Sequence, residues 1–164
     1  MLIVFGGLPG VGKTGLSRPV AQRLGMTLLR IDAIEAAMWR AGIARGPESG
    51  LGAYVVANTI AGGQFSIGGG VVVDAVNPVE AARRGWRDLA AEHGVPLRVI
   101  EVVCSDEREH RRRVEDREPQ PDQPAIPTWD DVVMREYEPW REPRLTVDTA
   151  RNSPPIDEIL AYCA

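Results

Sequence analysis

The chain has 164 residues, of which 44% are apolar and 26% are charged, which suits one compact domain with a single substantial core. Its formal net charge of -4 gives no overall positive field, and this disfavours a nucleic acid as partner. Its two cysteines, Cys104 and Cys163, lack metal-site spacing and are too few for a disulfide framework. No apolar run approaches the length of a membrane span or a signal peptide, so we expect a cytoplasmic protein.

Five short apolar runs, rich in β-branched residues, have the composition of buried parallel strands. They cover residues 2–5, 27–31, 71–73, 97–103 and 145–147. Helices are predicted between them, one from Lys13 to Leu24 that ends at Gly25 and one from Pro78 to His93 that ends at Gly94. Strands that alternate with helices predict crossover connections and a parallel sheet.

Other helix starts are predicted from capping residues three positions apart. These pairs are Asp32 with Glu35, Asp106 with Glu109 and Thr128 with Asp131. Two stretches break the regular alternation. Residues 42–52 are glycine-rich and we expect them to be irregular, before a helix over 54–60 that Gly62 and Gly63 interrupt. Residues 118–127 hold four prolines in ten positions and therefore predict a flap instead of a helix or central strand.

The strongest motif is Gly-x-x-x-x-Gly-Lys-Thr, which begins at Gly7 and ends at Thr14 between a predicted strand and a predicted helix. Glycines allow backbone N–H groups to turn toward phosphate oxygens, and the positive end of the helix adds to the attraction. Lys13 is expected to reach the β- and γ-phosphates of ATP, and the Thr14 hydroxyl to bind Mg²⁺. The predicted cofactor-binding residues are Gly7, Leu8, Pro9, Gly10, Val11, Gly12, Lys13, Thr14 and Gly15.

Asp74 follows the apolar run 71–73 and is the second candidate magnesium ligand. A carboxylate that ends a strand next to a phosphate-binding loop reaches the metal ion in many nucleotide-binding proteins, usually through water. The alternative is that Asp74 only caps a turn, as Asp does at the end of many strands.

The segments 6–14, 30–35 and 71–77, together with Arg113 and Arg117, resemble the small P-loop kinases known as AAA-like ATPases. That group is similar to chloramphenicol phosphotransferase and, more distantly, to gluconate kinase and the zeta-toxin kinases. The resemblance implies a P-loop NTPase three-layer α/β sandwich with a five-stranded parallel sheet in the order 2-3-1-4-5. It also implies a single kinase domain, a lid at about 108–127, an acceptor-side segment at about 35–66, and phosphoryl transfer from ATP to a small molecule.

The resemblance further implies roles for individual residues. Asp32 matches the catalytic base of this group, although with Glu35 it also fits a simple capping box. Arg113 and Arg117 match the lid arginines and lie four residues apart, so one helix face would carry both; a solvated basic face is the alternative. Arg151 and Asn152 occupy the position that contacts adenine in related kinases, or else an ordinary loop.

The acceptor is predicted less sharply than the nucleotide. Polynucleotide kinases of this superfamily carry Arg three residues after the catalytic Asp, whereas this chain has Glu35 there. A carboxylate beside the base would repel an anion, which favours an uncharged or cationic hydroxyl compound such as a nucleoside, sugar or antibiotic. The candidate residues around the acceptor are Met38, Trp39, Arg40, Arg45, Tyr54, Asn58, Trp129, Tyr137 and Trp140. A polynucleotide or nucleotide kinase and a non-kinase ATP-binding switch module remain as alternatives.

Overall fold

The computed structural model describes residues 1–118, 126–150 and 155–164. Five strands form one parallel sheet in the order β2-β3-β1-β4-β5, which confirms the predicted fold class and strand order. The strands are β1 Leu2–Gly6, β2 Thr27–Arg30, β3 Val71–Asp74, β4 Leu97–Val103 and β5 Leu145–Asp148. Each lies within one residue of its predicted bounds.

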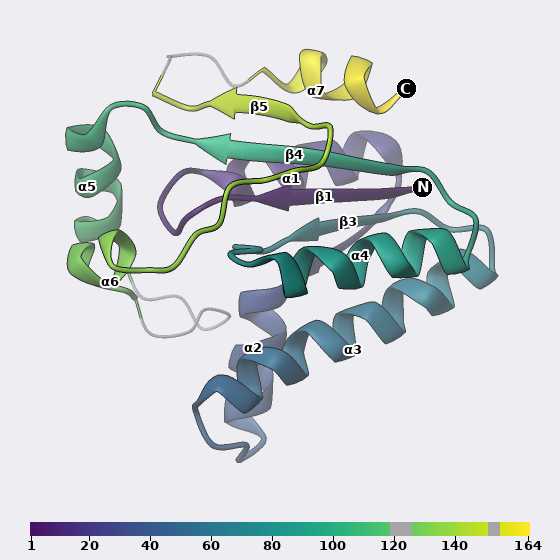
Figure 1. Ribbon diagram of the computed structural model, residues 1–164, viewed down its shortest axis with the longest axis horizontal. Helices are drawn as coiled ribbons and strands as arrows, with labels where there is room; N and C mark the ends of the chain where they lie inside the picture. The colour runs from purple at the N-terminus through teal and green to yellow at the C-terminus, as the bar shows by residue number, and fades with distance from the viewer. Residues whose placement is uncertain (119–125, 151–154) are drawn as a thin grey trace.

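Helices cover both faces of this sheet (Figure 1). They are α1 Lys13–Leu24, α2 Ile31–Arg40, α3 Pro47–Ser66, α4 Glu80–Glu92, α5 Glu107–Glu115, α6 Trp129–Val133 and α7 Ile156–Cys163. Helices α1 and α7 pack against one set of alternate strand residues, which includes Ile3, Phe5 and Val72. The helices α3 and α4 pack with the other set, which includes Leu2 and Val4. Among the described residues, no helix combines the length and hydropathy that a bilayer crossing requires.

Helix α3 corrects the prediction for residues 42–66. It runs unbroken from Pro47 to Ser66, although an irregular segment and a glycine interruption were expected there. Its buried positions, Ala53, Ala57, Ala61 and Phe65, recur every four residues and pack against the sheet and its neighbouring helices. This packing outweighs the cost of glycine in a helix, which is about 1 kcal/mol per residue.

The three predicted capping pairs have different outcomes. Asp106 accepts a hydrogen bond from the Glu109 amide, and Thr128 and Asp131 form a reciprocal capping box, so both predictions are confirmed. The pair Asp32 and Glu35 was wrong, because α2 begins one residue earlier, at Ile31, with Arg30 in the capping position. Asp32 therefore lies in the first turn of the helix.

A buried arginine joins the connection after β3 to the segment before β5. Arg83 is only 2% exposed, and its guanidinium lies 4.0 Å from the ring centre of Trp140. It donates hydrogen bonds of 2.5–3.2 Å to the backbone carbonyls of Asn77, Pro78, Glu138 and Pro139. Trp140 in turn packs so tightly on β1 that a Cβ atom at Gly6 would lie 2.3 Å from its ring. Arg83 thus fixes two loops at the end of the sheet that carries the phosphate-binding motif.

Replacing Arg83 with Met should lower the free energy of unfolding by about 3 kcal/mol or more, because four carbonyls would lose a charged donor in the interior. Arg84→Met is the matched control, since Arg84 is exposed on the same helix and should change stability little. Urea denaturation measures both values. Equal stabilities for the two variants would contradict this role of Arg83.

Candidate active site

The predicted phosphate-binding loop connects β1 to α1 at the carboxyl edge of the sheet. Glycine is required at two of its positions. A Cβ atom at Gly7, whose φ is +144°, would lie 2.3 Å from the Val102 carbonyl oxygen, and one at Gly10, whose φ is +84°, would lie 2.5 Å from the Val114 side chain. The motif spacing therefore reflects close contact with β4 and α5, not only chain flexibility.

The start of α1 fits an anionic ligand. Gly12 occupies the capping position and supplies no side-chain acceptor for the first N–H groups of the helix. Lys13 is largely buried, and its Nζ donates to the carbonyls of Gly7 at 2.8 Å and Leu8 at 3.0 Å. Burial lowers the pKa of the Lys13 ammonium, while the charges of Asp74 and Asp32 act in the opposite direction. These donors match what a triphosphate requires.

Thr14 and Asp74 meet where α1 approaches the end of β3. The Thr14 hydroxyl donates a 2.6 Å hydrogen bond to Asp74 Oδ2, and the Ser17 hydroxyl lies 3.3 Å from the same oxygen. The Arg30 Nε lies 3.7 Å from it. A hydroxyl and a carboxylate are the oxygen ligands that Mg²⁺ prefers. The described residues contain no cluster of three or more metal-binding side chains, so a magnesium ion here would also need oxygens from a nucleotide.

A cavity of about 460 Å³ brings most of the predicted site residues together. Its lining is Pro9, Gly10, Gly12, Lys13, Thr14, Gly15, Arg18, Pro19, Asp32, Asp74, Arg113 and Arg117. Arg18 and Pro19 were not predicted, because they lie on the second turn of α1, beyond the motif. The predicted adenine contacts, Arg151 and Asn152, lie outside the described residues.

Asp32 and Glu35 have different surroundings. Within the described chain, the Asp32 carboxylate makes no hydrogen bond or ion pair, and it lines the cavity. Glu35 does not line the cavity, and its Oε1 accepts a 2.8 Å hydrogen bond from the buried Ser49 hydroxyl. Glu35 therefore ties α2 to α3, and its charge alone gives little reason to exclude an anionic acceptor.

The two predicted lid arginines also differ. Arg113 donates to Glu109 at 2.7 Å and to the side chain and backbone of Thr149 at 2.8 and 2.9 Å. Arg117 lies two residues beyond the end of α5, so the prediction that one helix face carries both arginines was wrong. Both side chains nevertheless line the cavity. No hydrogen bond or ion pair joins Arg117 to another described residue.

The Glu109 carboxylate keeps Arg113 in place over a wide pH range. Hydrogen bonds from Arg112 and Arg113 lower the pKa of Glu109 to about 2. Because the pKa of the Glu109 carboxyl is lowered, the stabilising interaction of its carboxylate with Arg113 is complete above the ordinary pKa near 4.5. This interaction is lost as the pH falls through about 2. Arg113 is thus held against Thr149 at any physiological pH.

Sequence reasoning missed Thr149 and His110, which hold the phosphate-binding loop from the β4 and β5 side. The Thr149 hydroxyl lies 2.7 Å from the Val11 carbonyl oxygen and 3.2 Å from that of Val103. The His110 Nε2 lies 2.8 Å from the Pro9 carbonyl oxygen. A single Thr after a strand and a single His on a charged helix belong to no motif, so no sequence signal marks either residue.

Most aromatic candidates for the acceptor pocket have structural contacts instead. The Trp39 indole donates to Ser49, the Tyr54 hydroxyl accepts from the Asn77 amide, and the Trp140 indole donates to Tyr137. Burial also raises the pKa of the Tyr54 phenol. None of these side chains lines the cavity of the candidate site.

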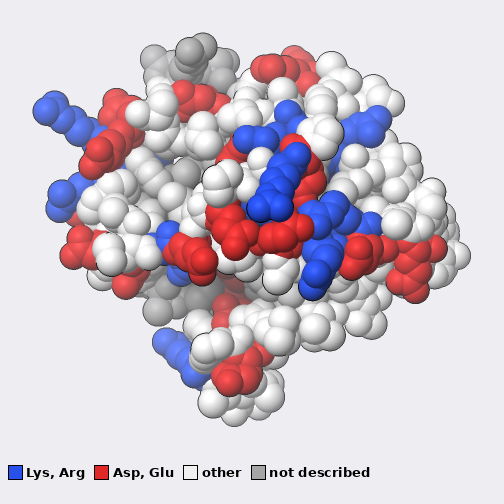
Figure 2. All heavy atoms as spheres, in the orientation of Figure 1, with Lys and Arg blue, Asp and Glu red and all other residues white. Residues whose placement is uncertain are grey.

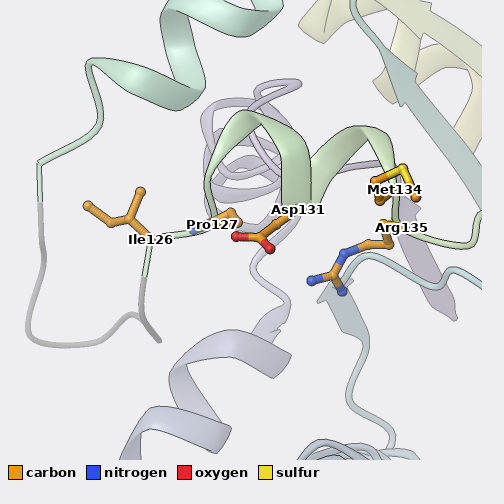
Figure 3. Close-up of a pocket in the computed structure, with 5 residues that line it drawn as sticks. All are labelled: Ile126, Pro127, Asp131, Met134 and Arg135. Atoms are coloured by element: carbon orange, nitrogen blue, oxygen red, sulfur yellow. The ribbon is translucent and has the colours of Figure 1, made fainter.

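Arg135 is a cation that the sequence analysis did not select. It extends from the end of α6 into a second cavity, of about 490 Å³, that Ile126, Pro127, Asp131 and Met134 also line (Figure 3). The charge of Arg135, like that of Arg117, acts on the Lys13 ammonium and adds to the lowering of its pKa by burial. Arg135 is therefore close enough to influence the lysine of the motif.

Thr149→Val should loosen the phosphate-binding loop, because three hydrogen bonds of the Thr149 hydroxyl disappear while the side-chain shape is kept. We expect the free energy of unfolding to fall by about 1–2 kcal/mol. Amide hydrogen exchange in residues 7–12 should become faster. Thr146→Val is the control, since Thr146 is exposed on β5, the strand that Thr149 follows. Unchanged exchange in the loop of the Thr149 variant would contradict this role.

Comparisons with known proteins agree with this geometry. The AAA domain family (AAA_33) matches residues 2–136. No sequence match was found among curated proteins. A candidate kinase from Chloroflexus aurantiacus is 21% identical, with a TM-score of 0.75 over 99% of this chain and 95% of that one.

Two further structures are similar over nearly their whole length. A sugar kinase from Janibacter sp. HTCC2649 is 18% identical, with a TM-score of 0.71 over 99% of this chain and 93% of that one. The Kti12 protein of Chaetomium thermophilum, solved with ADP-AlF3, is 21% identical, with a TM-score of 0.71 over 100% of both chains. At these identities the structures show a shared fold alone. The chain therefore belongs to the AAA domain family AAA_33 and has the fold of the small P-loop kinases.

Proposed function

We propose that this protein is an ATP-dependent kinase that transfers the γ-phosphate to a hydroxyl of a small molecule such as a nucleoside, sugar or antibiotic. One observation carries the proposal. The Asp32 carboxylate, which has no partner in the described chain, lines the same cavity as Lys13, Thr14 and Asp74. A nucleotide cradle alone would suit a switch or an ATPase, whereas an unpaired carboxylate beside it suits an alcohol acceptor.

The nucleotide would be held by the loop and the start of α1. Backbone N–H groups of residues 10–14 would bind the phosphate oxygens, and Lys13 would exchange its two backbone carbonyl partners for phosphate oxygens. Thr14 and Asp74 would hold Mg²⁺, which would neutralise part of the charge on the phosphates. The Kti12 structure, which has a similar fold and was solved with ADP-AlF3, supports a nucleotide as ligand.

Asp32 would orient the acceptor and take its proton. Its position in the first turn of α2 holds the carboxylate at the cavity wall. As the acceptor oxygen bonds to phosphorus, the bond between the γ-phosphorus and the β,γ-bridging oxygen would break, ADP would leave, and the hydroxyl proton would move to Asp32.

Arg117 is the better candidate for the transferred phosphoryl group, because its guanidinium has no other partner in the described residues. Arg113 is held by Glu109 and Thr149, so it would act from a fixed position at the cavity wall.

Asp32→Asn should separate transfer from binding. The amide cannot accept the hydroxyl proton, so transfer to the preferred acceptor should fall by about 100-fold to 10,000-fold, while the affinity for MgATP stays nearly unchanged. Isothermal titration calorimetry measures binding, and transfer of labelled γ-phosphate to a panel of nucleosides, sugars and antibiotics measures activity. Glu35→Gln is the control, since its amide oxygen can still accept from Ser49. Unchanged transfer by the Asp32 variant would remove Asp32 as the base.

Arg117→Met should lower kcat by about 100-fold with a smaller effect on nucleotide affinity, because it removes a charge that counts most in the transition state. Arg112→Met is the control. Arg112 pairs with Glu109 and Asp116 on the exposed side of α5 and does not line the cavity. Steady-state kinetics compares the two variants, and equal losses of kcat would show that the effect is only structural.

A further inference from the structure

The outer face of α3 is an apolar surface that the fold leaves open. The outer face is defined by Leu51, Val55, Val56, Thr59, Ile60 and Gly63, all exposed. Leu51 is 68% exposed and Val55 57%. The inner face of the same helix carries the buried residues Ala53, Ala57 and Ala61. An isolated domain normally places polar residues on the solvent side of a helix, so α3 lacks the expected pattern.

Charge is absent from this helix over most of its length. From Ser49 to Ser66 it carries no charged residue, in a chain where 26% of residues are charged. Four of the nine large apolar side chains that are exposed in the described part of the protein lie on α3. On the face that Figure 2 shows, acidic and basic side chains are interspersed. Ion pairs elsewhere in the protein include those of Arg87 with Glu80 and Glu142.

Gly63 is a second, independent feature of the outer face. It is exposed, its φ is not positive, and a Cβ atom added there would meet no described atom within 4 Å. The fold of a single chain therefore gives no reason for glycine, which destabilises the middle of a helix relative to alanine. Close approach of another backbone or a bulky side chain is what glycine at an open helix position permits.

The spacing along the helix indicates which surface fits there. Leu51, Val55, Thr59 and Gly63 follow one another at intervals of four and form a ridge. If a second α3 lies antiparallel across it, with a two-fold axis at the level of Ala57, Leu51 of each copy faces Gly63 of the other. Leu51, the largest side chain of the ridge, then packs over Gly63, which has no side chain, and Val55 faces Thr59.

We propose that α3 forms a two-fold symmetric interface with a second copy of this chain, in which Leu51 of each copy packs against Gly63 of the other. An uncharged face is best matched by another uncharged face, and a second α3 supplies one of the same length. Two-fold pairing of identical patches is also the commonest closed assembly of soluble proteins. No residue of α3 lines the cavity that contains Asp32 and Lys13, so the inference stands without the proposed kinase activity.

Sedimentation equilibrium of the full chain tests the assembly. At micromolar concentration the wild-type protein should have twice the 17.9 kDa mass of one chain. Leu51→Lys places two charges in the interface through the symmetry and should raise the dissociation constant by about 100-fold or more. Val133→Lys is the matched control, because Val133 is 59% exposed on α6 and should leave the dimer intact. A monomeric wild-type protein, or a dimer that Leu51→Lys leaves unchanged, would overturn the proposal.

Cysteine pairing tests the register. The double variant Leu51→Cys and Gly63→Cys should form a covalent dimer on mild oxidation, whereas each single variant should not, since Leu51 faces residue 63 and not itself. Cross-linking of the Leu51→Cys variant alone at the same rate would contradict the antiparallel arrangement. A covalent dimer that forms in the double variant, and in neither single variant, supports this arrangement.

Discussion

The hydrogen bond between the Thr14 hydroxyl and the Asp74 carboxylate joins the two halves of the candidate site, the start of α1 and the end of β3. It exists because β1 and β3 are neighbours, with Phe5 paired to Asp74 in the register. The same neighbourhood lets the Gly7 amide donate to the Val76 carbonyl and the Asn77 side chain donate to that of Phe5. The phosphate-binding loop and the acidic strand end are therefore fixed together before any ligand arrives.

The residues around this pair divide into those with fixed partners and those without. Thr149 and His110 hold the loop from outside, and Arg113 is bound to Glu109 and Thr149. Asp32 and Arg117 have no hydrogen-bond partner in the part of the chain that the structure describes, yet both line the cavity. A loop held by fixed contacts beside unpaired charges suits the proposed transfer to a second substrate, because the unpaired groups can change partners during the reaction.

The sequence predicted what local patterns encode. Buried strands show as short β-branched runs, and their positions were predicted correctly. The glycine-lysine motif shows as fixed spacing, and it lies between β1 and α1 as predicted. Helix α3 was predicted only over residues 54–60, because its full length depends on Ala53, Ala57 and Ala61 packing on other elements, which no local propensity reports. The partner of Glu35 was missed for a similar reason, since Ser49 lies fourteen residues away. Thr149 becomes part of the site only because β5 ends beside the loop. Contacts between distant residues explain each of these differences.

The destination of the γ-phosphate distinguishes a kinase from an ATPase or a switch most directly. ³¹P NMR can follow ATP in the presence of a mixture of small hydroxyl compounds extracted from cells. If the site acts as proposed, a phosphate monoester signal grows as ATP is consumed, and inorganic phosphate stays a minor product. If the γ-phosphate appears only as inorganic phosphate, or ATP binds without being consumed, the protein is not a kinase for these compounds and the central claim is wrong.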